Sequence, residues 1–393
     1  MGKRREEGLM GGLRVLITNH GMEQRAGTEL YVRDLALGLL ERGHTPVVYT
    51  ARVGEAAREL RRATIPVVDD LEMLASPPDL IHGQHHVETM TALLHFANVP
   101  AVFFCHGWAP WVETPPRFPR ILRYVAVDDT CRDRLLWEHG IPEPRVRVLL
   151  NFVDLKRFRP RGPLPPRPAR ALVFSNAASD STYLPAVREA CAQRGVALDV
   201  AGKQSGHVAD APEHLLGSYD LVFAKSRCAM EAMAVGAAVI LCDAVGAGPL
   251  VTAAEVARLR RLNFGVRSLR NGLRPELLAR EIDRYDARDA AEVTRWIRAE
   301  ADLGRTVDEI VELYREVIAE HRNVPPGDAA DAEARAAAAY LRWAAADMRE
   351  EREFYKKEFE DFENSAAVRL YKRLRGAPLL GPLARRLARK LAP

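Results

Sequence analysis

The stretch YDLVFAKSRCAMEAMAVGAAVILCD, residues 219–243, contains two short apolar runs on either side of a segment of small and sulfur-containing residues. Each apolar run has the length of a buried strand, and the segment between them predicts a helix. Ser226 is the expected N-cap of a helix over 227–235, because its hydroxyl can accept a hydrogen bond from a free amide. Gly236 is the expected end of that helix. The order strand, helix, strand predicts one unit of a parallel α/β sheet.

The same alternation of strands and helices occurs on both sides of this unit. Residues 13–155 predict a first doubly wound domain, with strands separated by amphipathic helices. Residues 156–170, KRFRPRGPLPPRPAR, predict a linker because their prolines interrupt both helix and central strand. Residues 171–325 predict a second domain, closed by helices at 274–303 and 306–321. The expected fold class is therefore α/β, with two tandem doubly wound Rossmann-like domains.

The two ends of the chain differ from these domains. Residues 1–12 predict a leader without an apolar core of its own. Residues 326–363 are rich in Ala, Arg and Glu and predict one long helix. An apolar residue recurs there every seven positions, but Glu351 and Glu358 occupy matching inward positions, so a stable coiled coil is not expected. Residues 364–393 predict a basic amphipathic tail.

The net charge of +4 is unevenly distributed over the 393 residues. Eight cations and no acidic residue follow Glu363, so the rest of the chain carries a net charge of −4. This balance argues against a nucleic-acid-binding surface on the two domains. Basic amphipathic helices bind anionic membrane surfaces, and residues 367–393 predict such a contact. A solvated or partner-binding helix is the alternative interpretation.

Several function classes are excluded by composition. The chain is 48% hydrophobic, as in a globular protein, yet no apolar run reaches the ~20 residues of a membrane span. Its five cysteines have no paired ligand spacing, which argues against a structural zinc site and favours a reducing compartment. We therefore expect a cytoplasmic protein that is peripheral at the inner face of a membrane.

The loop before the helix at 227–235 has the side chains of an anion site. In open α/β sheets, ligands bind at the carboxyl ends of the strands. Lys225 and Arg227, next to a helix N-terminus, suit a diphosphate. Glu231, one turn further on, could accept two hydrogen bonds from a vicinal diol such as a ribose. The alternative is that Arg227 and Glu231 form an i, i+4 surface pair.

Four segments resemble one known family. EAMAVGAAVI is similar to the EAMA-x-G-x-PVI signature of family 4-like glycosyltransferases, which have the two-Rossmann (GT-B) architecture. AGTELYVRDLALGLLERGHTPVVYT resembles the Gly-rich first loop and helix of that family, VPAVFFCHG its P-V-V-x-T-x-H strand, and VRVLLNFVDLKRFRP its N-G-V-D segment. The resemblance spans roughly residues 13 to 322. Each motif is weakly specific by itself, and their common order carries the resemblance.

The resemblance implies roles for individual residues. Glu231 would bind the ribose hydroxyls of the donor, and Gly27 and Thr28 would lie beside the donor phosphates or the acceptor. His106 would act at the transferred sugar, although a core histidine at a strand end is the alternative. Two further glycines in DAVGAGPLVT would be loop residues that approach the donor, or else turn residues only: Gly246 and Gly248.

The sequence also departs from the family pattern. Phe223 stands where the family has the first glutamate of E-x7-E, Phe152 where it has glycine, and Asp128 where it commonly has serine. FSNAASD, after the first strand of the second domain, lacks the cations of the family. Lys203, Lys225 or Arg227 would have to neutralise the diphosphate instead. Because of these departures, the sequence does not decide whether the reaction retains or inverts the configuration.

The resemblance and the anion site predict an enzyme. It would transfer a sugar from a nucleotide-sugar donor, such as a UDP- or GDP-sugar, to a glycan or lipid-linked acceptor of the cell envelope. Cations and a helix N-terminus would stabilise the leaving diphosphate, so no metal or other cofactor is expected. The sequence identifies no general base. The alternatives are a non-catalytic nucleotide-sugar-binding or scaffold protein at the membrane and a sugar-nucleotide epimerase.

Overall fold

The computed structural model describes residues 11–209, 211–323, 329–364 and 368. The predicted leader and the predicted basic tail therefore lie almost entirely outside the described residues, and both stay predictions.

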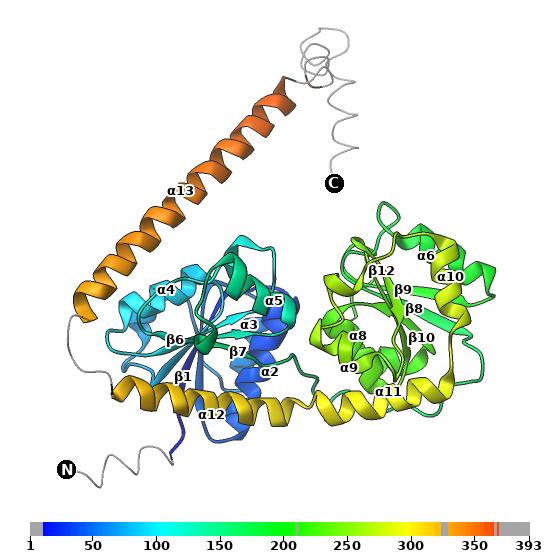
Figure 1. Cartoon of the computed structure of the whole chain (residues 1–393), viewed down its shortest axis with the longest axis horizontal. Helices are drawn as coiled ribbons and strands as arrows, with labels where there is room; N and C mark the ends of the chain where they lie inside the picture. The colour runs from blue at the N-terminus through cyan, green and yellow to red at the C-terminus, as the bar shows by residue number, and fades with distance from the viewer. Residues whose placement is uncertain (1–10, 210, 324–328, 365–367, 369–393) are drawn as a thin grey trace. The chain divides into compact units, whose positions relative to one another are not determined.

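The N-terminal domain is built on a seven-stranded sheet in the order β3-β2-β1-β4-β5-β6-β7, with every neighbouring pair parallel (Figure 1). Its strands are β1 (Arg14–Met22), β2 (Thr45–Val53), β3 (Val67–Val68), β4 (Leu80–Gly83), β5 (Ala101–Cys105), β6 (Ile121–Ala126) and β7 (Val146–Val148). Its helices include α2 (Gly27–Glu41), α3 (Glu55–Arg62), α4 (His86–His95) and α5 (Asp129–Asp133). Strands β4 and β5 are buried at every residue, as expected of a parallel sheet with helices on both faces.

The C-terminal domain contains a five-stranded sheet in the order β12-β11-β10-β8-β9, in which only β12 is antiparallel to its neighbour. The strands are β8 (Arg170–Phe174), β9 (Ala197–Ala201), β10 (Leu221–Ala224), β11 (Ala238–Asp243) and β12 (Gly246–Leu250). The helices include α6 (Leu184–Gln193), α7 (Pro212–Leu215), α8 (Ser226–Val235), α9 (Val256–Arg261), α10 (Pro275–Asp283) and α11 (Ala287–Glu300). The predicted fold class, two doubly wound α/β domains, is confirmed.

Alternating side chains of β10 belong to two separate cores. Val222 and Ala224 pack with residues of α8 and α11 on one face, whereas Leu221 and Phe223 pack with residues of α6 and α10 on the other. Successive side chains of a strand point to opposite faces, so a strand covered on both sides is apolar throughout. This arrangement explains why DLVFA is a continuous apolar run, and why Phe223 is a core residue with no exposed surface.

Helix α12 (Leu303–Arg322) corrects one expectation. The segment 306–321 was expected to close the second domain, but it packs against the N-terminal domain (Figure 1). The Tyr314 hydroxyl shares a 2.6 Å hydrogen bond with Nδ1 of His82 on β4, and Arg123 on β6 forms a 2.6 Å ion pair with Glu320. The physical reason is the buried apolar stripe of α12, which includes Val307 and is covered by α2, β5 and β6.

The chain crosses between the two domains in two places, and the crossings are bonded to each other. Val153 donates its amide to the carbonyl of Ala301 at 2.8 Å, and Leu303 donates to the carbonyl of Val153 at 3.1 Å. The predicted linker that follows is held on the C-terminal domain, since the amide of Arg161 bonds to Val235 at 2.7 Å. The two domains thus form one compact unit.

Helix α13 (Ala329–Glu363) belongs to a second structural unit, and its residues include most of those predicted to form the long helix, 326–363. Leu341, Met348 and Phe362, from the seven-residue repeat, have more than half of their surface exposed. Within the described part of the chain, no helix has both the length and the apolar character needed to cross a membrane.

Candidate active site

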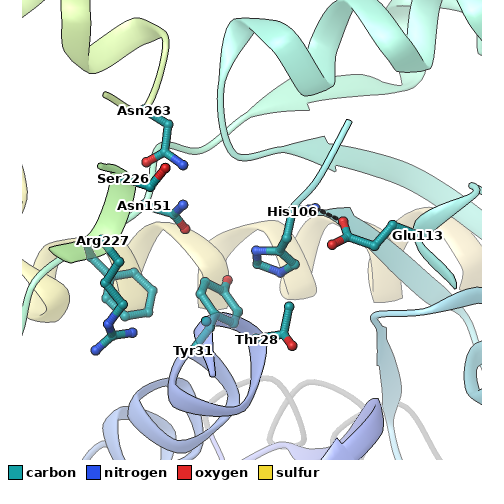
Figure 2. A pocket seen from close by; sticks show the side chains of 10 residues that line it. Thr28, Tyr31, His106, Glu113, Asn151, Ser226, Arg227 and Asn263 are labelled. Carbon is teal, nitrogen blue, oxygen red and sulfur yellow. Dashed lines mark hydrogen bonds between the residues drawn. The ribbon is translucent and has the colours of Figure 1, made fainter. Parts of the chain in front are cut away.

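A cavity of about 310 Å³ opens between the two domains, at the carboxyl ends of β5 and β10 (Figure 2). Strand-to-helix loops of both domains contribute to its wall, as expected for a ligand site in α/β sheets. The lining residues are Gly27, Thr28, Tyr31, His106, Glu113, Asn151 and Phe152 of the N-terminal domain, and Ser226, Arg227 and Asn263 of the C-terminal domain. Four of the eight residues predicted for the site are among them: Gly27, Thr28, His106 and Arg227.

His106 follows β5 and has an uncharged ring that is free to bind a ligand. Its ring meets that of Tyr31 edge-on, with centroids 4.3 Å apart, and Phe152 packs on the other side of Tyr31. Burial lowers the pKa of His106 to about 3, so the imidazole is neutral at neutral pH. Its Nε2 is buried and has no hydrogen-bond partner among the described residues. This nitrogen can bind a ligand hydroxyl, and the catalytic role of His106 stays a prediction.

Glu113 is a cavity residue that the sequence reasoning missed. It ends a short 3-10 helix, Trp111–Glu113, and its Oε2 accepts hydrogen bonds from the amides of His106, at 2.6 Å, and Gly107. Burial raises its pKa from an ordinary 4.5 to about 7, although the two amides oppose that shift. The signal in the sequence was a lone acidic residue in the stretch HGWAPWVETPP, shortly after a motif histidine.

Helix α8 begins one residue earlier than predicted. Lys225 is its N-cap and Ser226 its first residue, without a capping bond from the serine side chain. Ser226 has a φ of 49° because its amide is turned to the carbonyl of Phe264, at 3.1 Å. A non-glycine residue in this left-handed region is strained, and such strain is found at ligand sites. The helix ends as predicted at Gly236, with a φ of 112°.

Arg227 links the two domains through a buried ion-pair network. Its Nε bonds to Oε1 of Glu231 at 2.7 Å, and its Nη2 bonds to Oδ2 of Asp34 on α2 (Figure 2 shows Arg227 at the edge of the cavity). The i, i+4 pair therefore forms, but inside the protein, because the Glu231 side chain is only 5% exposed. Burial opposes the ionisation of Asp34, yet Arg227 and Arg33 hold its pKa below the ordinary value.

Comparison with known proteins identifies the fold and a family match over the N-terminal domain. Residues 25–157 match the sequence model of Glycosyltransferase Family 4. A glycosyltransferase from Rickettsia africae ESF-5 superposes with a TM-score of 0.59 at 15% identity, over 78% of this chain and 99% of that one. HepE from Anabaena, in complex with UDP and glucose, superposes with a TM-score of 0.57 at 16% identity, over 77% and 100%. Residues 25–157 thus match this family, and the fold of the chain is that of the two-domain (GT-B) glycosyltransferases. No curated protein matches it in sequence.

Glu231 does not reach the cavity wall. It lies behind Arg227, with one carboxylate oxygen occupied by that guanidinium. Burial raises its pKa, and Arg227 works against this rise. The ribose-binding role of Glu231 therefore stays a prediction, and it requires the Arg227 side chain to share the carboxylate with the donor.

The two lysines predicted near the diphosphate have protein partners. Lys225 Nζ forms an ion pair with Asp243 at the end of β11, away from the cavity lining. Lys203 Nζ donates to Oε1 of Gln24 in the N-terminal domain at 3.1 Å. Of the three cations predicted to neutralise the diphosphate, Arg227 is the one that lines the cavity.

Gly246 and Gly248 lie in strand β12, so the expectation that they are loop or turn residues is wrong. A Cβ atom at Gly246 would come within 2.9 Å of the Leu269 carbonyl, and one at Gly248 within 2.6 Å of the Ser268 carbonyl. Glycine is required here because the backbone packs closely on the segment after α9. Neither glycine lines the cavity.

The remaining polar residues of the strand ends have structural partners. Asp128 caps α5 by accepting the amide of Cys131 at 2.7 Å. His85 Nδ1 accepts the amide of His20, and His20 Nδ1 lies 3.0 Å from Glu88 Oε1. His20 and His85 are absent from the cavity lining, and these contacts assign them a structural role. Among the described residues, no group of three or more His, Cys, Asp or Glu side chains could hold a metal ion.

Proposed function

We propose that this glycosyltransferase moves a sugar from a nucleotide-sugar donor, such as a UDP- or GDP-sugar, to a glycan or lipid-linked acceptor of the cell envelope. We further propose that it needs neither a metal ion nor another cofactor. The observation that carries the proposal is the cavity between the domains, where the start of α8 and Arg227 face residues of the N-terminal domain. A family 4 match over the N-terminal domain supports it.

The start of α8 suits the leaving group of the reaction. A nucleotide sugar releases a nucleoside diphosphate, on which negative charge grows as the bond to the anomeric carbon breaks. The first amides of an α-helix and its dipole attract such an anion. Arg227 adds a guanidinium at the same wall, already ion-paired with Asp34 and Glu231. A well-placed hydrogen-bond donor can lower a reaction barrier by roughly 2.7–4 kcal/mol. HepE, which has the same fold, is known in complexes with UDP and with UDP-glucose.

Donor binding and turnover test this function directly. The purified protein, with EDTA present, is titrated calorimetrically with UDP- and GDP-sugars and then assayed for release of the nucleoside diphosphate. We expect one donor to bind and to be consumed in EDTA when a suitable acceptor is present. Absence of binding to every donor would contradict the proposal, and loss of turnover in EDTA alone would contradict metal independence.

The role of Glu231 has a separate test. If its carboxylate holds the ribose diol, the wild type should bind the intact donor more tightly than the 2′-deoxyribose analogue. Glu231→Gln should lose that preference, because an amide binds the diol less well than a carboxylate does. An unchanged preference in the variant would show that another group binds the ribose.

The acceptor and the location rest on the basic tail, residues 367–393. Its leucines at i, i+4 and i+8, with arginines between them, support contact with an anionic membrane on the cytoplasmic side. The full chain should float with vesicles that contain phosphatidylglycerol and not with pure phosphatidylcholine. A chain ending at residue 363 should float with neither. Equal flotation of both chains would exclude the tail as the anchor.

A non-catalytic binding or scaffold protein is the second candidate function. The observation that favours it is that two of the three predicted cations are paired with carboxylates: Arg227 bonds to Glu231 and Asp34, and Lys225 pairs with Asp243. A scaffold would bind a donor without consuming it, whatever acceptor is offered. Release of nucleoside diphosphate above the rate of spontaneous hydrolysis would rule this candidate out.

A further inference from the structure

Two side chains in the cavity wall each have a buried polar atom without a hydrogen-bond partner among the described residues. These atoms are Nε2 of His106 in the N-terminal domain and Oδ1 of Asn263 in the C-terminal domain. Asn263 is only 7% exposed. Leaving a buried polar group without a partner is costly, and such groups are uncommon in native proteins. In the wall of a ligand cavity, such an atom indicates a contact that the ligand completes.

The backbone around Asn263 is strained, and the surrounding structure maintains the strain. Asn263 has a φ of 54° and Phe264 a φ of 49°, in the left-handed region that most residues avoid. Phe264 is fully buried, its amide donates to the carbonyl of Leu259 at 2.9 Å, and its carbonyl accepts the amide of Ser226 at 3.1 Å. Strain of this kind persists where neighbouring contacts enforce it, and it is concentrated at functional sites. The segment after α9 therefore holds the Asn263 carboxamide at the cavity wall.

The side chains that line the cavity with Asn263 fall into two chemical kinds. Asn263, Ser226 and Asn151 come from three segments of the chain and offer neutral amides and a hydroxyl (Figure 2). Ser226 is a close neighbour of this segment, since a Cβ atom at Gly265 would lie 3.4 Å from its Oγ. Arg227 and the first turn of α8 suit the diphosphate instead. The cavity thus has an anion-binding part and a part with neutral hydrogen-bonding groups.

The unpartnered atom of Asn263 limits which part of the donor it can bind. An amide oxygen only accepts hydrogen bonds, so its ligand has to carry a proton. Sugar hydroxyls carry one, whereas the ionised oxygens of a diphosphate do not. His106, on the N-terminal side of the same cavity, also has an uncharged ring with a free nitrogen. A pyranose ring has hydroxyls that point in several directions, and it can contact both domains at once.

We propose that Asn263 binds a hydroxyl of the transferred sugar and thereby selects the sugar of the donor. The hydroxyl donates its hydrogen to Oδ1 of Asn263, and Asn151 and Ser226 bind neighbouring hydroxyls. A donor without that hydroxyl leaves Oδ1 buried and unpartnered, which is how a polar site rejects an incomplete substrate. Asn263 is a binding residue in this proposal and takes no part in bond breaking. The proposal rests on the proposed function.

Asn263→Gly tests the contact, because glycine keeps the left-handed conformation and removes the carboxamide. Calorimetry without acceptor compares UDP-glucose and UDP-N-acetylglucosamine with UDP, and GDP-mannose with GDP. The wild type should bind one sugar nucleotide more tightly than its diphosphate. The variant should lose roughly 2- to 10-fold in affinity for that sugar nucleotide and none for the diphosphate. Unchanged affinity for both, or equal weakening of both, would overturn the proposal.

Asn98→Gly is the matched control. Asn98 also has a left-handed backbone, with a φ of 63°, but it is exposed and lies outside the cavity lining. Its replacement should leave the affinities for the sugar nucleotide and the diphosphate unchanged. A loss of sugar-nucleotide affinity that matches the loss in Asn263→Gly would overturn the assignment to the Asn263 carboxamide.

A second measurement does not depend on how the variant folds. The wild type is titrated with analogues of the preferred sugar nucleotide that each lack one hydroxyl of the sugar. One analogue should bind roughly 5- to 100-fold more weakly than the parent, and Asn263→Gly should not distinguish the two. Equal binding of every analogue by the wild type would overturn this proposal, while turnover of the parent would leave the proposed function intact. Failure of the wild type to bind any sugar nucleotide would overturn both.

Discussion

At the scale of single residues, Arg227 is the centre of a buried ion-pair network. Its guanidinium joins Asp34 and Glu231, whose side chains are 3% and 5% exposed. A buried charge without a partner is costly, so Glu231 depends on Arg227, whereas Asp34 also pairs with Arg33 at 2.6 Å. A sugar diphosphate that binds beside Arg227 therefore meets a cation whose charge is already shared with two carboxylates.

Removal of that guanidinium should cost more stability than removal of an exposed one. Arg227→Met leaves Glu231 buried without its bonded cation and leaves Asp34 with Arg33 alone. We expect a loss of roughly 3–5 kcal/mol in the free energy of unfolding, measured by urea denaturation. Arg258→Met breaks a pair with Glu255 in which the arginine is 55% exposed, and it should cost ~0–1 kcal/mol. Equal losses in the two variants would show that the network does not stabilise the fold.

Glu113 should make stability depend on pH. Its pKa is about 7 in the folded protein and near 4.5 in the unfolded chain, so the folded state binds the extra proton between these values. Stability from this group is therefore complete below pH 4.5 and is lost as the pH rises through 7. The loss is roughly 3 kcal/mol for such a shift. Glu113→Gln should lack it, so its melting temperature relative to wild type should be higher at pH 8 than at pH 5. A constant difference between the two proteins would contradict the raised pKa.

At the scale of elements, strand β12 and helix α8 have different roles: β12 packs at the edge of the second sheet, and α8 lines the cavity. Strand β12 closes the edge of the second sheet, and its glycines let it pack against the backbone at residues 268–271. Helix α8 starts from a strained Ser226 and presents its first turn to the cavity. Gly246 and Gly248, which were expected to lie close to the donor, are thus required for backbone packing.

Alanine substitutions at two predicted glycines should separate these roles. Gly248→Ala places a methyl group 2.6 Å from the Ser268 carbonyl and 2.9 Å from Leu241 Cβ, and we expect it to lower stability by ~1–3 kcal/mol. Gly27→Ala meets nothing within 4 Å at the start of α2, and alanine is favoured over glycine in a helix. It should leave the urea midpoint unchanged or raised. The reverse order of stabilities would contradict the assignment.

Strands and helices could be predicted from the sequence because their patterns are local. The apolar runs of β10 and β11 and the glycine after α8 determine these elements within a few residues. The bond between Arg227 and Asp34 could not be predicted in the same way, since the two residues are 193 positions apart in the chain. Glu113 follows no motif, and its environment is created by the fold. Burial and long-range contacts are what the sequence leaves undetermined.

At the scale of the whole molecule, the two domains are joined by α12 and by ion pairs. Arginines of the C-terminal domain bond to acidic residues of the N-terminal domain in three pairs: Arg227–Asp34, Arg261–Asp129 and Arg267–Asp133. Helix α12 begins at the second crossing and runs along the N-terminal domain. The prediction placed this helix on the wrong domain. An amphipathic stripe predicts that one face of a helix is buried, but it does not indicate which domain covers that face.

The attachment of α12 should depend on the buried bond between Tyr314 and His82. Tyr314→Phe leaves Nδ1 of His82 buried without this partner, and we expect a loss of ~1–3 kcal/mol in the free energy of unfolding. His82→Phe combined with Tyr314→Phe removes both polar groups and should recover part of that loss. Additive losses in the double variant would show that the two side chains act independently.

The pairing of the two crossings at Val153, Ala301 and Leu303 has a consequence for how the enzyme can be divided. Proteolytic cleavage in the proline-rich stretch after Val153 leaves the second crossing, at Asp302, intact. Helix α12 then belongs to the C-terminal fragment and still packs against the N-terminal domain. The cleaved enzyme should therefore migrate as one particle on a native gel and as two fragments in detergent. A single cut at either crossing therefore leaves the two fragments of the protein bound to each other.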